Sequence, residues 1–481
     1  MAQRIAFGEW MPDQPGLSGA LTDAKNVVSQ AVGYGPLPTA ATFSEEADEN
    51  LTTLVAGKTP VNNTKLFAAG STKIYDVSGI GALTDVSKSG GYTPNSDSDR
   101  FRFTQFGNSI IGTNYSDPMQ SYTLGTSTEF DDLSASAPLC KFLTVVRDFV
   151  VVAFTTESST VYPARVRWSD LNDETNWVSG ATSQADYQDI ADGGQIVGIR
   201  GGEFGLVFME KAIHRMSYIG TPLIFQFDNI SRGKGCIAAS SIAQVQGVSF
   251  FLSDDGFYMC DGQNVTAIGS EKVDRYFFAN ADESAFETMS AAIDPVRKLV
   301  IWNYKDIFAQ RKLIIYNFKT QKWTHGDAGT DYISDASTAA SDLEDLDSIS
   351  ASIDALPVSL DSVLYIGGKY FLGGTSGAYV MTYNGTPATG QIITGDIDAG
   401  GRPVVTLARP QIDNGSATVS VVSRTTLAEQ PSFGTAVAAD SENRVSLRSN
   451  GRYHRLKVVP TGDNWTTAIA IDVDIVGQGG R

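Results

Sequence analysis

The sequence is poor in the residues that build disulfide frameworks, zinc sites and histidine-based metal centres. Its 481 residues include three cysteines and three histidines, which are Cys140, Cys236, Cys260, His214, His325 and His454. The odd cysteine number and the lack of a CxxC pair argue against disulfides and zinc knuckles. No histidine lies in an HExxH motif or beside a cysteine. We therefore expect buried free thiols, no metal site and no cofactor.

Positive charge is also scarce. The chain has 36 Lys and Arg against 54 Asp and Glu, which gives a formal net charge of −18. Proteins that grip phosphate or read DNA sequence need clustered Lys and Arg, because binding is driven by counterion release. This balance opposes tight nucleic-acid binding. An acidic surface can still face DNA without holding it.

Long apolar runs are missing as well. The most apolar stretch, FLTVVRDFVVVAF, is interrupted by Arg147 and Asp148, and it falls short of the roughly 20 residues that span a bilayer. The opening residues MAQRIAFGEW contain no basic segment followed by an apolar one, so nothing here resembles a signal peptide. We expect no membrane insertion. We also expect the protein to be assembled in the cytoplasm of the producing cell.

A recurring phrase fills the chain from about residue 60 to 385: an apolar or aromatic run, a Gly/Asp/Asn turn, and another such run. The 47 glycines suit this many tight turns. The clearest instances span residues 65–77, 103–117, 143–155, 199–219, 245–269, 291–326 and 363–385. Their starts are roughly 40–60 residues apart, which overlaps the period of β-propeller blades.

Within a unit, apolar and polar side chains alternate, as in KLIIYNF at 312–318, followed by a turn at 319–322 and Trp323. Alternation of this kind is typical of strands, and a propeller blade needs about four of them. A single unit cannot cover its own apolar face, so neighbouring units must stack against it. The sequence predicts an all-β fold with a β-propeller body of six or seven blades. Stacked β-sandwiches are the alternative.

Three segments depart from the phrase. Residues 1–60 are rich in Pro and Gly and aperiodic, which predicts an extended N-terminal arm along a partner or along the propeller edge. Residues 61–387 form the propeller, with a short amphipathic helix inserted near 340–356 before Pro357. Residues 388–481 contain alternating runs such as SATVSVVS and TTAIAIDVDIV, which predict a C-terminal β-sandwich.

No motif nominates a catalytic, cofactor-binding or metal-binding residue, and we expect no enzyme. The densest acidic cluster lies on the inserted helix, where a solvated face is the simplest interpretation; its residues are candidates for a channel lumen or tip and are Asp342, Glu344, Asp345 and Asp347. A locally basic patch near the end favours a solvated strand face over a phosphate site; it comprises Arg444, Arg448, Arg452, Arg455 and Lys457. Acidic pairs for glycoside hydrolysis stay open, because such pairs assemble from distant loops.

Three passages together carry a family resemblance. They are AKNVV at 24–28 with GYGPLP at 33–38; ARVRWSD at 164–170 with Trp177, DGFY at 255–258, DG at 261–262, IG at 268–269 and KVD at 272–274; and GRYHR at 451–455 with Trp465 and the closing GQGGR. With this pattern, the chain resembles the packaged-DNA stabilisation proteins, or tail hub (nozzle) proteins, of short-tailed bacteriophages.

That resemblance implies a structural virion protein with a propeller body. It would form a homo-oligomeric ring, usually a homohexamer, in the viral tail, below the portal and the adaptor or head-completion protein and beside tail fibre or tail tip proteins. The ring would retain packaged DNA and conduct it non-specifically during ejection. The protein would be assembled in the bacterial host cytoplasm and located in the virion. With the net charge of −18, we expect a lumen that repels phosphate, so that DNA slides without sticking.

Two other functions fit the residues. A carbohydrate-binding or carbohydrate-degrading propeller would use exposed aromatics and acid pairs. A propeller scaffold for protein complexes would present its blades to partners and would be monomeric on its own. A glycan array with a depolymerase assay separates the first from a nozzle, and native mass spectrometry separates the second.

Overall fold

The structure is a computed structural model that describes residues 2–59, 64–339, 352 and 368–477. The predicted helical insertion near 340–356 lies outside these residues except for Ser352. The four acidic candidates of that insertion, Asp342, Glu344, Asp345 and Asp347, therefore also lie outside the part of the chain that is described.

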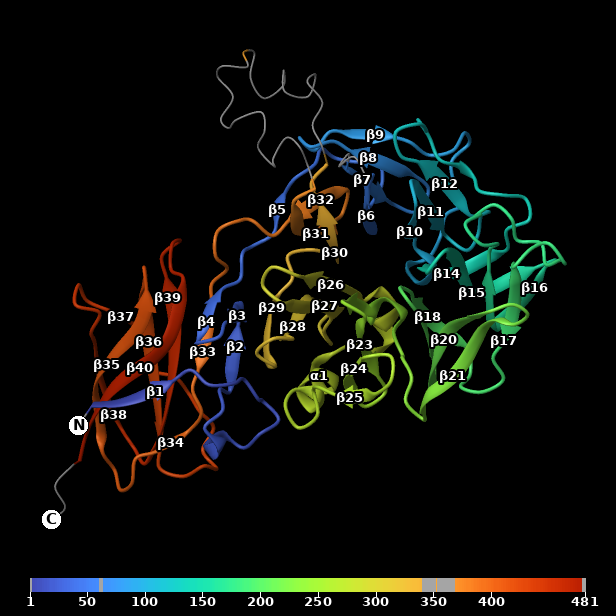
Figure 1. Ribbon diagram of the computed structural model, residues 1–481. Helices are drawn as coiled ribbons and strands as arrows, with labels where there is room; N and C mark the ends of the chain where they lie inside the picture. Colours follow the sequence, from blue (N-terminus) through green and yellow to red (C-terminus); the bar gives the residue numbers. More distant parts are fainter. Residues whose placement is uncertain (1, 60–63, 340–351, 353–367, 478–481) are drawn as a thin grey trace.

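Seven antiparallel units of four strands follow one another along the chain (Figure 1). Six of them are separate four-stranded sheets, and the remaining one, β26–β29, is one end of a ten-stranded sheet. The first three are β6 (Thr53–Lys58), β7 (Thr64–Ala69), β8 (Ile74–Val77) and β9 (Leu83–Asp85); β10 (Arg102–Phe106), β11 (Ser109–Thr113), β12 (Gln120–Thr123) and β13 (Asp131–Asp132); and β14 (Leu139–Val146), β15 (Phe149–Glu157), β16 (Thr160–Trp168) and β17 (Asp186–Asp189). Each of the seven recurring segments found in the sequence lies in a different one of the seven units.

The other four sheets complete the body. They are β18 (Ile196–Arg200), β19 (Gly205–Met209), β20 (Ala212–Gly220) and β21 (Ile224–Arg232); β22 (Ala243–Val245), β23 (Val248–Ser253), β24 (Gly256–Cys260) and β25 (Val265–Ala267); β26 (Ser290–Asp294), β27 (Leu299–Lys305), β28 (Arg311–Asn317) and β29 (Lys322–Asp327); and β30 (Tyr332–Ser337), β31 (Tyr370–Ser376), β32 (Tyr379–Thr382) and β5 (Ala41–Thr42).

The seven sheets form a closed ring. The first strands of successive blades contact one another around the body, except that β18 of the fourth blade contacts the 3₁₀ turn Ala239–Ser241 before β22 of the fifth. β30 of the seventh blade contacts β6 of the first. The outermost strand of the seventh sheet is β5, which precedes the whole body in sequence and pairs with β32. The fold is therefore a seven-bladed β-propeller closed by an N-terminal strand, at the upper end of the predicted blade number.

The alternation in residues 312–318 explains how blades stack. Leu313 and Ile315 enter a buried cluster that also contains Ile333 of the seventh blade. Ile314 and Tyr316 point the other way, into a cluster with Phe257 and Trp323. Successive side chains of a strand leave on opposite faces, so β28 supplies apolar surface to both neighbouring blades. This burial on both faces is why the strand is nearly all apolar.

One helical feature was not predicted. Between the fifth and sixth blades the chain forms α1 (Asp274–Asn280) and the 3₁₀ helix η4 (Glu283–Thr288). Phe277 of α1 is fully buried, with its ring centroid 4.8 Å from that of Phe257. Seven residues make about two turns, which is too short a segment for a helical period to be read from sequence.

The C-terminal residues form the predicted β-sandwich of two sheets. One contains β33 (Gln391–Ile393), β34 (Ile397–Asp398), β36 (Ser416–Arg424), β37 (Val437–Ala438) and β39 (Tyr453–Thr461). The other contains β35 (Val404–Asp413), β38 (Val445–Asn450) and β40 (Thr467–Val476), joined by the N-terminal strands β1 (Ala2–Ala6), β3 (Val27–Ser29) and β4 (Tyr34–Pro36).

The N-terminal segment is extended, and its strands pair with other parts of the chain. β1, β3 and β4 enter the sandwich, whereas β5 lies on the propeller edge. β6 already belongs to the first blade, so the body begins at Thr53 and not at residue 61. These strands are two to six residues long, and such short runs give no period that sequence can reveal. β1, β4 and β5 pair with strands hundreds of residues away, whereas β3 pairs with the neighbouring β4 and β6 with the neighbouring β7.

A single sheet links the two domains. β2 (Asp23–Lys25) pairs in parallel with β29 of the sixth blade, Lys25 opposite His325, and antiparallel with β33 of the sandwich. The sixth blade thereby extends into a ten-stranded sheet that ends at β37. In Figure 1, β2 and β33 lie between the propeller and the sandwich. Hydrogen bonds across β2 fix the sandwich relative to the blade.

Candidate functional site

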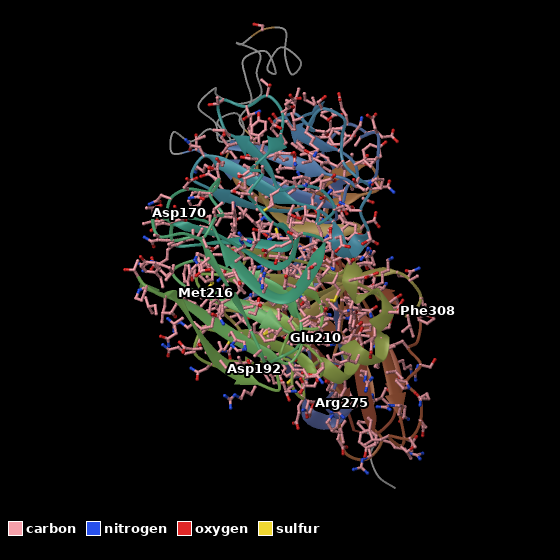
Figure 2. The ribbon with its side chains drawn as sticks, turned by 90° about the vertical axis from the view of Figure 1, so that its right-hand side faces the viewer. Asp170, Asp192, Glu210, Met216, Arg275 and Phe308 are labelled. Atoms are coloured by element: carbon pink, nitrogen blue, oxygen red, sulfur yellow. The ribbon has the colours of Figure 1, made fainter. Side chains whose placement is uncertain are left out.

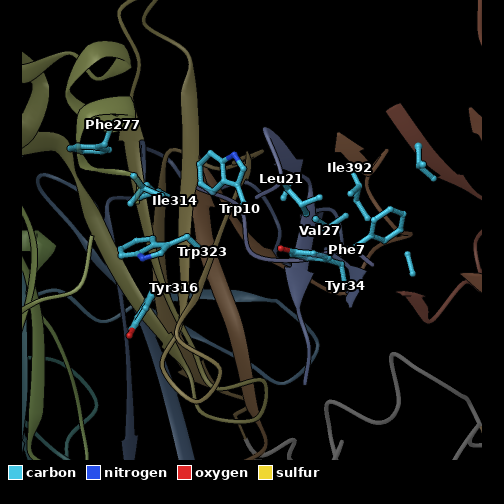
Figure 3. Packing of buried hydrophobic residues seen from close by; sticks show 14 of the residues in the cluster. Phe7, Trp10, Leu21, Val27, Tyr34, Phe277, Ile314, Tyr316, Trp323 and Ile392 are labelled. Atoms are coloured by element: carbon cyan, nitrogen blue, oxygen red, sulfur yellow. The ribbon is translucent and has the colours of Figure 1, made fainter. Parts of the chain in front are cut away.

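The junction between the domains is built around Trp10. Its indole is 1% exposed, stacks on His325 with centroids 4.7 Å apart, and meets the edge of Tyr276 at 5.1 Å. Its Nε1 donates to the carbonyl oxygen of Thr22 at 3.3 Å. Figure 3 shows Trp10 beside Trp323 and Ile314 of the sixth blade, with Phe7, Leu21 and Val27 continuing the core toward the sandwich. Residues 7–34 therefore form an apolar strap between the domains.

Charged groups surround this apolar strap. Asp23 Oδ1 and His325 Nε2 lie 2.5 Å apart, within hydrogen-bonding distance. The Asp327 carboxylate forms ion pairs with the Nζ atoms of Lys25 and Lys312, each at 2.7 Å. Burial opposes ionisation of Asp327, but the hydrogen bonds from the two lysines outweigh it and lower the pKa of Asp327 to about 2. The junction therefore combines an apolar core with paired charges.

The first passage of the family resemblance lies in this junction. Asn26 has a positive φ of 54°, a conformation that asparagine tolerates better than most residues. Its Nδ2 donates to Asp327 Oδ2 at 3.3 Å and to the carbonyl of Thr389 at 3.1 Å, and its Oδ1 accepts from the Asp327 amide at 2.8 Å. Asn26 thus bonds the sixth blade on one side and the segment before β33 on the other.

The second passage lies in the third and fifth blades. Arg165 forms a two-pronged ion pair with Asp189 at 2.7 and 2.9 Å, and its guanidinium lies 3.6 Å from the ring centroid of Tyr162 and 3.9 Å from that of Tyr187. Hydrogen bonds from Arg165 to Asp189 raise the pKa of Arg165 and lower that of Asp189. The passage stabilises the outer strands of a blade.

Asp274 accounts for the glycines of the same passage. Its Oδ1 accepts a hydrogen bond from the Phe257 amide at 3.1 Å. A Cβ on Gly256 would lie 2.2 Å from Asp274 Oδ2, and one on Gly269 would lie 2.0 Å from Oδ1, so only glycine fits at both positions. Burial raises the pKa of Asp274 to about 7.

The third passage forms a charged cluster inside the sandwich. Asp396, with a side chain 4% exposed, pairs with Arg424 and with Arg455, the latter at 2.8 Å. Burial opposes the ionisation of Asp396, but hydrogen bonds from the two arginines lower its pKa. His454 Nδ1 lies 2.6 Å from Ser423 Oγ on the neighbouring strand.

The predicted basic patch is largely neutralised by nearby acids. Arg444 pairs with Asp440 at 3.1 Å and with Glu442 at 2.7 Å. Arg452 pairs with Asp398 at 2.9 Å. Together with the Asp396 cluster, these contacts favour the solvated-face interpretation over a phosphate site.

The centre of the propeller encloses a cavity of about 490 Å³. All seven blades line it, through their first strands or the turn before β22. Three arginines reach it: Arg100, Arg102 and Arg200. The sequence alone did not reveal this cluster. Arg100 and Arg102 are far from Arg200 in the chain, and they meet it only when the ring closes. The one available signal was the presence of Arg on both sides of Phe101, just before an apolar run.

The remaining candidates are dispersed. His214 lies beside Asp192 at 3.1 Å in the fourth blade, far in sequence from His325 and His454, which lie at the junction and in the sandwich. Within the described ranges, no group of three or more His, Cys, Asp or Glu residues is placed to hold a metal ion. Cys140, Cys236 and Cys260 are free and buried, and burial raises the pKa of each thiol. No helix in the same ranges is long and apolar enough to cross a bilayer.

An exposed apolar tip stands out on the sixth blade. The turn between β27 and β28 carries Ile307 and Phe308, which are 57% and 77% exposed. Figure 2 shows Phe308 at the outer edge of the molecule. Adjacent exposed apolar side chains of this kind mark contact sites for proteins more often than isolated ones do.

Comparison with known proteins gives a fold likeness and no family. No family model and no curated protein sequence match the chain. Among solved structures, the WD40 domain of Neurospora crassa Pan2 is similar with a TM-score of 0.40 and 8% identity over 72% of this chain and 96% of that one. The WD40 domain of Toxoplasma gondii coronin has a TM-score of 0.38 and 10% identity over 75% and 86%.

A puromycin hydrolase S511A mutant complexed with PGG is similar with a TM-score of 0.37 and 8% identity, over 66% of this chain and 55% of that one. At these scores the likenesses carry no argument about function. The propeller assignment rests on the seven sheets and their closed ring.

Proposed function

We propose that this chain is a non-catalytic structural protein in which a propeller and a sandwich, held in one orientation, present surfaces to protein partners. The observation that carries the proposal is the ten-stranded sheet running from β26 in the propeller to β37 in the sandwich. Domains joined by a flexible linker reorient freely. Here, the shared sheet and the buried strap around Trp10 hold both domains together.

The exposed tip at Ile307 and Phe308 supplies a first partner surface. We expect the double substitution Ile307→Ser and Phe308→Ser to leave the unfolding transition unchanged and to weaken association with the partner, because both side chains lie in solvent. Val296→Ser is the matched control, since Val296 is 74% exposed on the opposite turn of the same blade. Equal loss of association with the control would contradict a role for the tip.

The more specific form of this proposal is a tail hub, or nozzle, ring below a portal and adaptor, which retains packaged DNA and conducts it during ejection. The resemblance of the three passages supports it, together with the excess of acidic residues in the sequence. Asn26 of the first passage bonds the sixth blade and the segment before β33, so it helps to hold the two domains in a fixed relation, and Arg455 of the third passage pairs with Asp396 within the sandwich. A ring protomer under load needs such a relation.

Native mass spectrometry of the purified full chain tests the ring. We expect a particle of several copies, six in the hub proposal, whereas a monomer favours a scaffold for other proteins. A glycan array and a depolymerase assay on the same preparation test the non-catalytic part. Sugar binding or chain cleavage would contradict it.

A further inference from the structure

The three arginines of the propeller channel have no acidic partner. Among the described residues, no direct ion pair joins a carboxylate to Arg100, Arg102 or Arg200, although the charges of Asp97, Asp99 and Asp335 act on them from farther away. This contrasts with Arg165 and Arg455 elsewhere in the chain, which are paired at 2.7 and 2.8 Å. Uncompensated cations are costly away from bulk water, and here they gather in a protein of net charge −18.

Main-chain carbonyls hold the guanidinium groups in place. Arg200 donates to the carbonyls of Ile199 at 3.0 Å and Ile242 at 2.5 Å, although a guanidinium carries five N–H donors. Arg102 donates to the carbonyls of Ser98 at 2.9 Å and Lys141 at 3.3 Å. Carbonyl partners fix the direction of a guanidinium without cancelling its charge, and donors remain for another acceptor.

Arg100 is the most deeply placed of the three. It is 5% exposed, donates to the carbonyl of Met289 at 2.5 Å and lies 4.8 Å from the ring centroid of Tyr332. A second arginine, Arg311, approaches the same ring at 5.0 Å. The ring and the carbonyl orient Arg100 as a fixed donor at the cavity wall.

The arginines act on one another. Burial, together with the charges of Arg100 and Arg200 and against the charge of Asp99, lowers the pKa of Arg102 to about 9. Burial also lowers the pKa of Arg100 and Arg200. The three groups therefore share one electrostatic environment of positive potential, which an anion would relieve.

Asp335 is the acidic residue that lines this cavity within the described ranges. Its side chain is exposed to the cavity, yet surrounding protein raises its pKa, against the attraction of Arg200. One carboxylate beside three guanidinium groups leaves the cavity with excess positive charge. Hydroxyl groups supply further hydrogen-bonding capacity around it, from Thr53, Thr104, Thr144, Ser290 and Ser334.

We propose that the propeller channel is a binding site for a small, multiply charged oxyanion, of the phosphoryl or polycarboxylate class, held by Arg100, Arg102 and Arg200. The volume of about 490 Å³ lies within the range of small-molecule sites. Guanidinium groups bind carboxylate and phosphoryl oxygens through paired N–H donors. The site is independent of the ring or scaffold role, because it lies within one protomer.

An adjoining cavity shares part of its wall with the channel. It has a volume of about 690 Å³ and shares Arg102, Phe142 and Ala239 with the channel. Its other charged lining residues are Lys141, Lys211, Glu210, Asp254 and Glu287, so the excess of positive charge is confined to the channel.

Isothermal titration calorimetry of the full chain with sodium tripolyphosphate and, separately, with citrate tests the site. We expect saturable binding of at least one probe by the wild type. Arg200→Gln should weaken it at least about tenfold, because a lost charge-assisted hydrogen bond is of that order. Arg448→Gln is the matched control: it removes the same charge from an exposed sandwich residue and should leave the affinity unchanged.

Asp335→Asn should change the affinity for the anion in the opposite direction. Removing the carboxylate that lines the channel should tighten binding several-fold, and this variant retains every arginine if Arg200→Gln does not fold. Binding of tripolyphosphate alone identifies the phosphoryl class, and binding of citrate alone the polycarboxylate class. No binding by folded wild-type protein, equal weakening by Arg448→Gln, or weaker binding by Asp335→Asn would each overturn the proposal.

Discussion

Buried arginines in the propeller and in the sandwich face opposite electrostatic conditions. In the sandwich, Arg424 and Arg455 converge on Asp396, whose side chain is 4% exposed. In the channel, the hydrogen bonds that Arg100 and Arg102 donate within the described ranges go to main-chain carbonyls, and aromatic rings lie beside both guanidinium groups. In the sandwich the arginines surround the Asp396 carboxylate, whereas in the channel they line the cavity.

In the sandwich the arginine charges are neutralised by a carboxylate and stabilise the fold. In the channel the arginine charges are held by carbonyls, which do not neutralise them. A buried pair is costly to break, because the remaining charge has no solvent. A buried cation held by carbonyls keeps its charge available to a ligand. The substitutions below test this difference in charge pairing. They are given from the largest expected effect to the smallest.

Asp396→Asn should have the largest effect, because it turns the sandwich cluster into an uncompensated one like the channel. We expect the free energy of unfolding to fall by about 3–5 kcal/mol, the cost of breaking a buried ion pair. Urea denaturation of the full chain measures it. A loss below about 1 kcal/mol would show that water reaches Arg424 and Arg455 and that the two clusters do not differ as described.

Asp274 extends the comparison to negative charge, since it is a buried carboxylate held by an amide. Its pKa in the folded state is about 7, above the roughly 3.9 of an unfolded chain. The protonated form is therefore favoured on folding, and its stabilisation is complete below about pH 4 and is lost as the pH rises through about 7.

We expect Asp274→Asn to reduce this decline in stability by about 1–2 kcal/mol between pH 4 and 8, after allowance for partial solvent screening. Thermal denaturation across that range measures it. Parallel curves for the two proteins would mean that Asp274 is already ionised in the folded state at pH 5.

Arg102→Gln tests the channel directly, and the expected change in unfolding free energy is within about 1 kcal/mol. Relief of repulsion from Arg100 and Arg200 offsets the lost hydrogen bonds to Ser98 and Lys141. Urea denaturation without added anions measures it. A loss as large as that of Asp396→Asn would mean that Arg102 is a structural residue and would remove the distinction between the regions.

Asp398→Asn should have the smallest effect. Asp398 pairs with Arg452 at 2.9 Å on the sandwich surface, where ion pairs are screened by solvent. We expect no resolvable change in the urea midpoint. A clear change would show that the outer ion pairs contribute as the buried Asp396 cluster does.

The sequence predicted the propeller because each blade carries its own local signal. The run at 312–318 is nearly all apolar because Leu313 and Ile314 enter cores on opposite sides of β28. The sandwich was predicted for the same reason, since β39 alternates in burial along its length. Turns with Gly or Asp, such as the one before Gly256, fixed the hairpins.

Features that depend on distant residues were beyond prediction. The strands β2 and β5 acquire their pairing from β33 and β32, far along the chain. Arg102 and Arg200 meet only through ring closure, and no local pattern places them together. The short helix α1 takes its conformation from the packing of Phe277 on Phe257 rather than from a period of its own.

Ring closure by β5 has a consequence for synthesis. Ser44, just after β5, bonds to Val380 of β32 across 336 residues. At ribosomal rates of 5–20 residues per second, the N-terminal strand waits roughly 20–70 s for its partner. An unpaired strand is a template for wrong pairing, and very short strands limit that risk. The two-residue length of β5 and the Pro- and Gly-rich residues around it protect the nascent chain until the last blade is made.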